Sequence, residues 1–299
     1  LHPYMQRSLI KYIFDILNNK NENFRKLLKE LFELEGIRGQ AILVTHSPNI
    51  ILNNYKQVVR FFVEDEKISV VSGRDIRIQK EVEKHLLRNL AYFKEAFFSR
   101  CAIIVEGDSE LGAFPLFAKT MGIDLDENGI IIIKADGKES IPKIAELLKE
   151  FKIPFCAFAD RDKENDYSDW DFYYEITSCT DFEEEIIDNL LNNGGENYLD
   201  CILNKSFDQA WQQITVQETL LNKANNIYKV VNGTPEIKSF KDIPNGDKKL
   251  QKLFYLSLFI QKKSITLGRI IGENLTEELI PDSFKKVLLE AEKLSKKVT

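Results

Sequence analysis

From residue 100 onward the chain alternates short apolar runs with stretches in which apolar residues recur every three or four positions. Continuous apolar runs of this length are typical of buried parallel strands, and the longer spacing is typical of amphipathic helices. Strands are predicted at 101–105, 129–134, 153–159 and 171–177, and helices at about 109–121 and 140–151. This alternation predicts an α/β fold with a mostly parallel sheet and helices on both of its faces.

The segments on either side of this region have a different pattern. Before it, helical spacing covers 3–18 and about 22–35, and the charged stretch Asp75–Ser99 predicts an amphipathic connecting helix. Further strands are predicted there at 41–45, 58–63 and 67–71. After it, about 186–299 is helix-rich, with breaks at Gly194-Gly195, Gly233-Thr234-Pro235 and Pro244-Asn245-Gly246.

These changes of pattern divide the chain into four parts. Residues 1–71 form the first part, 72–99 a linker helix, 100–190 the α/β core and 191–299 a helical region that completes the core. His85 lies beside the apolar stripe of the linker helix and is interpreted as structural.

Length and composition fit a soluble chain of two or three domains, with 299 residues of which 43% are hydrophobic. No apolar stretch approaches the about 20 residues of a membrane span, and Leu1-His2-Pro3 does not begin a signal peptide, so we expect a cytoplasmic location. Four scattered cysteines and three histidines encode neither a disulfide framework nor a zinc site. The net charge of −6 argues against nonspecific coating of DNA without excluding DNA as a partner.

Carboxylates directly follow two of the predicted strands. Glu106 comes after the strand at 101–105, and Asp160 and Asp162 come after the strand at 153–159. Because the ligand crevice of an open α/β sheet lies outside the carboxyl ends of its strands, these acids can converge there on one hard cation. The pattern is that of a magnesium-dependent phosphodiester enzyme.

Acids at such positions also serve to cap the following helix. Asp108 or Ser109 is placed to cap the helix that starts here, and Glu110 would then face a metal from its first turn. Both roles are compatible with the spacing.

The motifs are Val105-Glu106-Gly107-Asp108-Ser109-Glu110 and, a βαβ-length interval later, Ala159-Asp160-Arg161-Asp162. In this order, each behind a strand, they resemble the Toprim domain of topoisomerases, primases and OLD-family nucleases. The resemblance implies a Rossmann-like, mostly parallel sheet. Lys138, after the second strand, is interpreted either as a phosphate contact or as a solvated loop lysine.

A second acidic segment, Thr177–Glu185, follows the last predicted strand. By itself it is typical of a helix start, where the helix dipole favours acids. OLD-family nucleases carry a similar segment, Ser-x-x-Asp-Leu-Glu, after their Asp-x-Asp strand. That resemblance implies that Ser178, Asp181 and Glu183 help to hold a second metal ion, and leaves open which of the two acids is the closer ligand.

The segment Phe259–Ile271, followed by Leu279-Ile280-Pro281, resembles the C-terminal block of the OLD family, in which a lysine precedes a helix. By that match Lys263 is the catalytic lysine. Lys262 is the alternative, because the alignment can slip by one residue. Both lysines also fit an exposed basic helix start.

The first part of the chain resembles the C-terminal half of ABC-type ATPase heads of the SMC and RecF kind. Leu1–Gln6 is similar to the segment after the Walker B acids, and Thr45-His46-Ser47-Pro48 to the switch-histidine motif. His46 would then sense the γ-phosphate in the full protein; the other interpretation is a hydrogen-bonded structural histidine. The sequence contains no Gly-x-x-x-x-Gly-Lys-Ser/Thr loop and no Walker B run before Leu1. We expect an ATPase remnant without ATPase activity, with ATP a cofactor of the full-length protein only.

Together these resemblances identify the chain as the C-terminal part of an OLD-family ATP-dependent endonuclease, a family that includes Gabija-type phage-defence nucleases. They imply DNA cleavage with two Mg²⁺ or Mn²⁺ ions. Glu106, Glu110 and Asp160 would hold one ion and Asp162, Asp181 and Glu183 the other, with Asp160 or Asp162 able to bridge. They also imply a homodimer or higher homo-oligomer, leave room for a helicase partner, and give no role to a membrane.

Two other classes of function share parts of this pattern. A noncatalytic nucleotide-binding or assembly module would keep the fold without using the metal site. A primase or an RNA-cleaving Toprim enzyme would use the same acids on another substrate. A topoisomerase is disfavoured, because no motif places a tyrosine as a covalent nucleophile.

Overall fold

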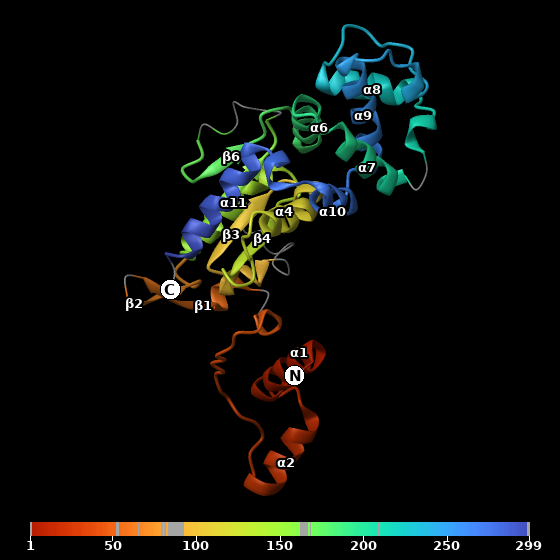
Figure 1. The fold of residues 1–299 in the computed structure, drawn as a ribbon. Coiled ribbons are helices and arrows are strands. Elements are labelled where there is room, and N and C mark those ends of the chain that lie inside the picture. Colours follow the sequence, from red (N-terminus) through yellow and green to blue (C-terminus); the bar gives the residue numbers. More distant parts are fainter. Residues whose placement is uncertain are drawn as a thin grey trace.

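The computed structural model describes residues 2–51, 54–64, 66–78, 80, 82, 93–161, 167, 169–207 and 210–297. Its centre is a parallel four-stranded sheet in the order β4-β3-β5-β6 (Figure 1). The strands are β3 (Cys101–Val105), β4 (Ile130–Lys134), β5 (Phe155–Ala159) and β6 (Tyr174–Ile176). The predicted α/β class and mostly parallel sheet are confirmed.

Helices cover both faces of the sheet. Cys101, Ile103 and Val105 of β3 face a core shared with α4 (Asp108–Thr120) and α11 (Asp282–Ser295). Ala102 and Ile104 face the opposite core, shared with α5 (Ile141–Glu150). Because successive side chains of a strand point to opposite faces, an unbroken apolar run is what a strand buried on both faces requires.

The helical region after the sheet follows the predicted breaks, which all fall between helices. Its helices are α6 (Phe182–Asn192), α7 (Glu196–Phe207), α8 (Glu218–Tyr228), α9 (Lys248–Lys262) and α10 (Ile265–Asn274). The last helix, α11, returns to the sheet and packs against β3 and β5. The C-terminal part of the chain therefore contributes a helix to one layer of the α/β core, beside α4.

Two glycines allow α10 to lie directly on α4. A Cβ atom at Gly112 would stand 2.2 Å from the backbone oxygen of Ile265, and one at Gly268 would stand 2.0 Å from that of Ser109. Contact at this distance requires residues without a side chain on both helices. The first turn of α4 is therefore held against the start of α10.

The N-terminal part contains α1 (Pro3–Leu17), α2 (Glu22–Phe32) and an antiparallel hairpin of β1 (Val59–Glu64) and β2 (Lys67–Ser72). The strand predicted at 41–45 is wrong: this segment has no regular structure, and Ile42 and Val44 are 91% and 93% exposed. A strand needs a neighbour for its backbone hydrogen bonds, and no strand among the described residues pairs with 41–45.

The hairpin packs against the α/β core. The buried guanidinium of Arg60 donates to the carbonyl oxygens of Phe151 and Lys152, just beyond the end of α5, and to that of Phe97. The carbonyls of Phe151 and Lys152 lack intrahelical partners, so Arg60 caps α5 from another part of the chain. Burial lowers the pKa of Arg60 to about 10.

The predicted linker helix over Asp75–Ser99 lies largely outside the described residues, and so does His85. At its ends, Asp75 belongs to a turn and 96–98 form a 3-10 helix. The 3-10 helices that lie wholly within the described ranges include Pro48–Ile50, Tyr55–Gln57, Ala96–Phe98, Lys138–Ser140, Trp211–Gln213, Phe240–Asp242 and Glu277–Leu279. None of the helices in the described ranges combines the length and apolarity that crossing a membrane requires.

Candidate active site

The site begins where the sheet reverses its order. The chain moves from β3 outward to β4 and then crosses to β5 on the other side of β3, so β3 and β5 flank a topological switch point. Glu106 follows β3 and Asp160 follows β5. The backbone N–H of Asp160 donates to Oε2 of Glu106 at 3.1 Å, so the two strand ends meet as predicted.

The first turn of α4 brings in Glu110. Gly107 is the N-cap residue and no side chain caps this helix, so the predicted capping by Asp108 or Ser109 is wrong. Asp108 instead pairs with Lys134 at 2.7 Å. A Cβ atom at Gly107 would lie 3.1 Å from Oε2 of Glu110, so glycine leaves room for that carboxylate.

The start of α6 contributes two further acids. Asp181 is its N-cap, and Oδ1 of Asp181 accepts from the backbone N–H of Glu184 at 2.9 Å. Glu183, only 2% exposed, accepts from the hydroxyl of Ser109 at 2.6 Å. Oδ1 of Asp160 accepts from the backbone N–H of Phe182 at 3.0 Å, which ties this helix start to the end of β5.

Glu106, Glu110, Asp160, Asp181 and Glu183 thus form one acidic cluster, and repulsion within it appears in the pKa values of Glu110, Asp160 and Glu183. Burial, with Glu183 and Glu106 nearby, raises the pKa of Glu110 to about 8. Burial and the charges of Glu110 and Asp181 raise the pKa of Asp160 well above its ordinary value. Burial also raises the pKa of Glu183, although Lys263 opposes the shift. A cluster of this kind favours a neutralising positive charge.

Lys263 supplies one such charge. It is the C-cap residue of α9, and its Nζ lies 2.7 Å from Oδ2 of Asp181 and 2.7 Å from Oε2 of Glu183. Burial lowers the pKa of Lys263, but these two acids outweigh it and raise the pKa above the ordinary value. Nζ of Lys262 instead lies 4.8 Å from the ring centroid of Phe207. Of the two lysines left open by the sequence, Lys263 contacts the cluster.

Two contacts of the cluster were missed from the sequence. The hydroxyl of Tyr228, at the end of α8, donates to Oδ2 of Asp181 at 2.6 Å, and Ser109 donates to Glu183. Ser109 lies within the first acidic motif, so its position was a usable signal. Tyr228 lies outside every segment that carries the resemblance, and no local pattern marks it.

Other predicted site residues have other surroundings. The backbone N–H of Ser178 donates to Oε2 of Glu185 at 2.7 Å, and the other Glu185 oxygen accepts from Ser283. Asp162 lies outside the described residues. His46 is exposed in the N-terminal part, and Lys138 lies in the 3-10 helix after β4.

The chemistry of the donors fits a hard divalent ion. The cluster offers only carboxylate oxygens, the ligands that magnesium and manganese prefer. Within the part of the chain that the structure describes, no three acidic, histidine or cysteine side chains have the arrangement of a metal site as they stand. The ammonium of Lys263 lies between two of the acids and takes the place of a cation there.

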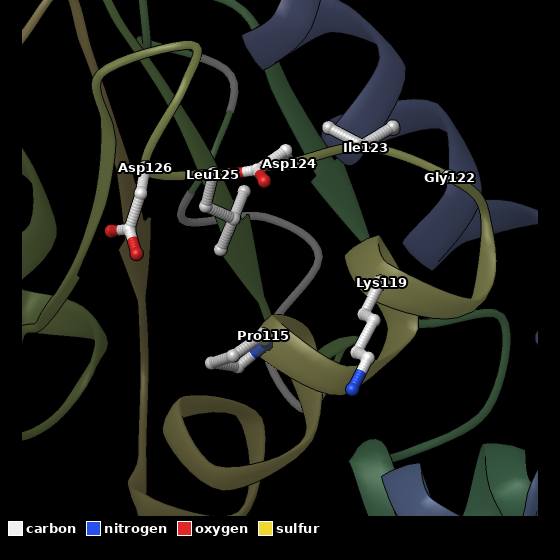
Figure 2. Close-up of a pocket in the computed structure, with 7 residues that line it drawn as sticks. All are labelled: Pro115, Lys119, Gly122, Ile123, Asp124, Leu125 and Asp126. Atoms are coloured by element: carbon white, nitrogen blue, oxygen red, sulfur yellow. The ribbon is translucent and has the colours of Figure 1, made fainter.

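A separate hollow of about 480 Å³ lies at the opposite end of α4 (Figure 2). It is lined by Pro115, Lys119, Gly122, Ile123, Asp124, Leu125 and Asp126. These residues come from the end of α4 and the loop that follows, so the hollow includes no member of the acidic cluster. The chemistry is concentrated at the strand ends instead.

A parallel sheet with acids at its switch point defines the class of an α/β protein of the Toprim type. Residues 97–162 match the family model of the TOPRIM domain of Overcoming lysogenization defect protein-like proteins. This segment is therefore an OLD-like Toprim domain, which indicates a nuclease-type function. A comparison with curated proteins finds no significant match.

Solved structures similar to this chain include C-terminal regions of two OLD proteins. That of Xanthomonas campestris pv. campestris has 21% identity and a TM-score of 0.44, covering 67% of this chain and 98% of its own. That of Burkholderia pseudomallei has 18% identity and a TM-score of 0.43, covering 66% of this chain and 99% of its own. The domain assignment rests on the family model.

Proposed function

We propose that this chain is a metal-dependent DNA endonuclease that nicks or cuts phosphodiester bonds. The observation that carries the proposal is the convergence of carboxylates from the tips of β3 and β5 and from the first turns of α4 and α6, with the ammonium of Lys263 in contact. Together with the OLD-like Toprim domain, this arrangement favours phosphodiester hydrolysis over other chemistry.

Each side chain has a role in this proposal. Glu106, Glu110 and Asp160 would hold one Mg²⁺ or Mn²⁺ ion, and Asp162, Asp181 and Glu183 would hold a second. When bound, two such ions stabilise the attacking and the leaving oxygen of an in-line displacement. The sequence resemblance alone makes Ser178 a further ligand candidate, and its backbone N–H donates to Glu185.

Lys263 stabilises negative charge on the phosphate. Its side chain is 40% exposed while its ammonium touches Asp181 and Glu183, so the same group can reach both the cluster and a substrate in solvent. The raised pKa keeps Lys263 protonated at neutral pH. A fixed positive charge of this kind acts without giving up its proton.

The test is cleavage by the purified chain with Mg²⁺ or Mn²⁺ on supercoiled DNA, linear DNA and RNA side by side. Glu106→Ala, Asp160→Ala and Asp162→Ala should each abolish DNA cleavage without unfolding the chain, because removing one acid relieves repulsion. Asp108→Asn is the matched control: this acid lies in the first turn of α4, as Glu110 does, but pairs with Lys134. It should cleave at the wild-type rate.

The same assay separates the alternatives. Cleavage confined to RNA would replace the DNA proposal with an RNA-cleaving enzyme. A chain that neither binds Mn²⁺ in a calorimetric titration nor cleaves any substrate would instead be a noncatalytic module. Normal DNA cleavage by Asp160→Ala would refute the metal-site assignment.

We also propose that residues 1–71 are a fragment of an ABC-type ATPase head. Oγ of Ser47 contacts Oε1 of Gln6 at 2.5 Å, so the two segments that resemble ATPase motifs lie side by side. Homo-oligomerisation, a helicase partner and a role in phage defence remain proposals from the resemblance. Light scattering of the purified protein and phage challenge of cells with the intact gene test the first and the last of these.

A further inference from the structure

Tyr228 is a buried residue whose only polar group points into the acidic cluster. It is the last residue of α8 and is 7% exposed. Its hydroxyl donates to Oδ2 of Asp181 at 2.6 Å. A phenol has one proton to donate, and here the acceptor is a carboxylate proposed to hold a metal ion.

The carboxylate of Asp181 is held from two directions. Oδ1 accepts from the backbone N–H of Glu184 in the first turn of α6. Oδ2 accepts from both Tyr228 and Lys263, at 2.6 and 2.7 Å. Because the helix start fixes one oxygen, the tyrosine and the lysine together determine where the other lies.

Hydrogen bonds hold the backbone around Tyr228 in place. Lys229 ends α8 in the left-handed conformation, with a φ of 51°. The side chain of Asn225, one turn earlier, donates to the carbonyl oxygen of Gly233 and accepts from the backbone N–H of Val231 at 3.1 Å. The loop after the tyrosine is therefore tied back onto α8, which fixes the backbone that follows Tyr228.

Tyr228 and Lys263 reach Asp181 from two packed helices. Tyr228 closes α8, Lys263 caps the end of α9, and these two helices pack against each other. Asp181 is the N-cap residue of α6, close to the carboxyl end of β5. The contact therefore joins the ends of α8 and α9 to the start of α6, which is itself bonded to the end of β5.

We propose that Tyr228 is a positioning residue that orients Asp181 for metal binding and, through Asp181, places the ammonium of Lys263. This inference rests on the proposed nuclease function and adds to it a residue outside the acidic motifs. Partners that hold a metal ligand in place typically change metal affinity or activity by about 10- to 100-fold when removed.

The test compares Tyr228→Phe with Tyr255→Phe. Both variants keep the ring and lose one hydroxyl from a buried tyrosine of the helical region; Tyr255 is 2% exposed and donates to Asp200 at 3.3 Å, away from the cluster. Mn²⁺ affinity is measured by calorimetry without DNA, and kcat and KM are measured with DNA. Melting temperatures show whether each variant folds.

Tyr228→Phe should bind Mn²⁺ about tenfold more weakly and lower kcat by a similar factor, whereas KM for DNA stays within about twofold, because the hydroxyl bonds a protein carboxylate. Tyr255→Phe should change none of these. In an Asp181→Asn background, Tyr228→Phe should cause no further loss of Mn²⁺ affinity, since the hydroxyl acts through that acid.

The outcomes separate the two proposals. If the wild-type chain cleaves DNA and Asp181→Asn is impaired, but Tyr228→Phe matches Tyr255→Phe, only the role of Tyr228 is refuted. Equal Mn²⁺ losses from Tyr228→Phe in the wild-type and Asp181→Asn backgrounds would also refute it. A wild-type chain that neither binds Mn²⁺ nor cleaves DNA overturns both the nuclease proposal and this inference.

Discussion

At the scale of single residues, the acidic cluster destabilises the fold when no metal ion is bound. Glu110 and Glu183 are almost fully buried, at 3% and 2% exposure, and each lies close to other acids. A carboxyl group with a raised pKa stabilises the fold only while it is protonated. The metal-free chain should therefore carry a stability cost at neutral pH that the removal of one acid relieves.

Glu110→Gln should show this cost. The pKa of Glu110 is about 8 in the folded chain and 4.5 ordinarily. The stability that its protonated carboxyl group contributes is therefore fully present below pH 4.5 and is lost as pH rises through 8. Relative to wild type, the variant should gain more than about 1 kcal/mol between pH 5 and 8.5, as one pKa unit corresponds to about 1.4 kcal/mol. Unfolding in EDTA at the two pH values measures this gain.

The control for that experiment is Glu139→Gln, which removes an exposed carboxyl group. It should leave the pH dependence of unfolding unchanged. If Glu110→Gln loses stability relative to wild type as pH rises, the electrostatic description of the cluster is wrong.

Lys263→Ala should lower the DNA cleavage rate by about 100-fold or more, the scale of losing one preorganised charge-stabilising group. Lys262→Ala removes the same charge one residue earlier, from a side chain that lies over Phe207, and should cleave nearly as wild type. Single-turnover cleavage rates decide the point. A large loss in Lys262→Ala alone would shift the assignment by one residue, and no loss in either variant would remove the lysine from the mechanism.

At the scale of elements, the site depends on how α10 is held against α4. Gly268 of α10 touches the backbone of Ser109, the residue before Glu110, and Lys263 stands just before α10 begins. The spacing of these two helices thus sets the distance between the lysine and the acids. A side chain at the crossing must push the helices apart.

Gly268→Ala should destabilise the chain by roughly 1–3 kcal/mol, the usual cost of overpacking. It should also reduce cleavage more than tenfold, because a displacement of about 1 Å at a reacting site can cost 100-fold. Thr266→Ala, on an exposed position of the same helix, is the control. Thermal unfolding and cleavage rates are measured together, and equal behaviour of the two variants would contradict the proposed role of the crossing.

The sequence predicted the elements of the core well, because their burial is local information. The run at 101–105 is apolar throughout and β3 occupies the same residues. The strand at 41–45 failed for the opposite reason: its apolar residues predict a strand, but strand formation depends on a neighbour elsewhere in space. Helix α11 was predicted only as part of a helical region, since nothing local shows that it returns to the sheet.

The candidate site likewise has residues that the sequence predicts and residues that it does not. Acids at strand ends can be predicted to converge because parallel strands share an edge, and Glu106 and Asp160 do meet. Tyr228 lies 47 positions from Asp181 and in a different helix, so only the packing of α8 brings it to the cluster. The choice between Lys262 and Lys263 likewise depends on the exact residue at which α9 ends.

At the scale of the whole molecule, the N-terminal part differs from the core in how much apolar surface it exposes. Val44 is 93% exposed, and Phe61 and Ile68 of the hairpin are 68% and 77% exposed. Large exposed apolar surfaces mark places where another surface docks. This is consistent with the proposal that residues 1–71 belong to an ATPase head, while the acidic cluster is assembled from the rest of the chain.

The last prediction follows from this separation. The sequence lacks the glycine-rich loop whose backbone and lysine hold nucleotide phosphates, so the 299-residue chain should neither bind nor hydrolyse ATP, whatever His46 does in a longer protein. The proposed metal ligands and Lys263 all lie within residues 106–263, so DNA cleavage with Mg²⁺ or Mn²⁺ should not change when ATP is added. Nucleotide-binding calorimetry, phosphate release and cleavage with and without ATP measure this directly. Cleavage that requires ATP, or phosphate release by the chain itself, would overturn the description of its first 71 residues as a remnant that lacks its nucleotide site.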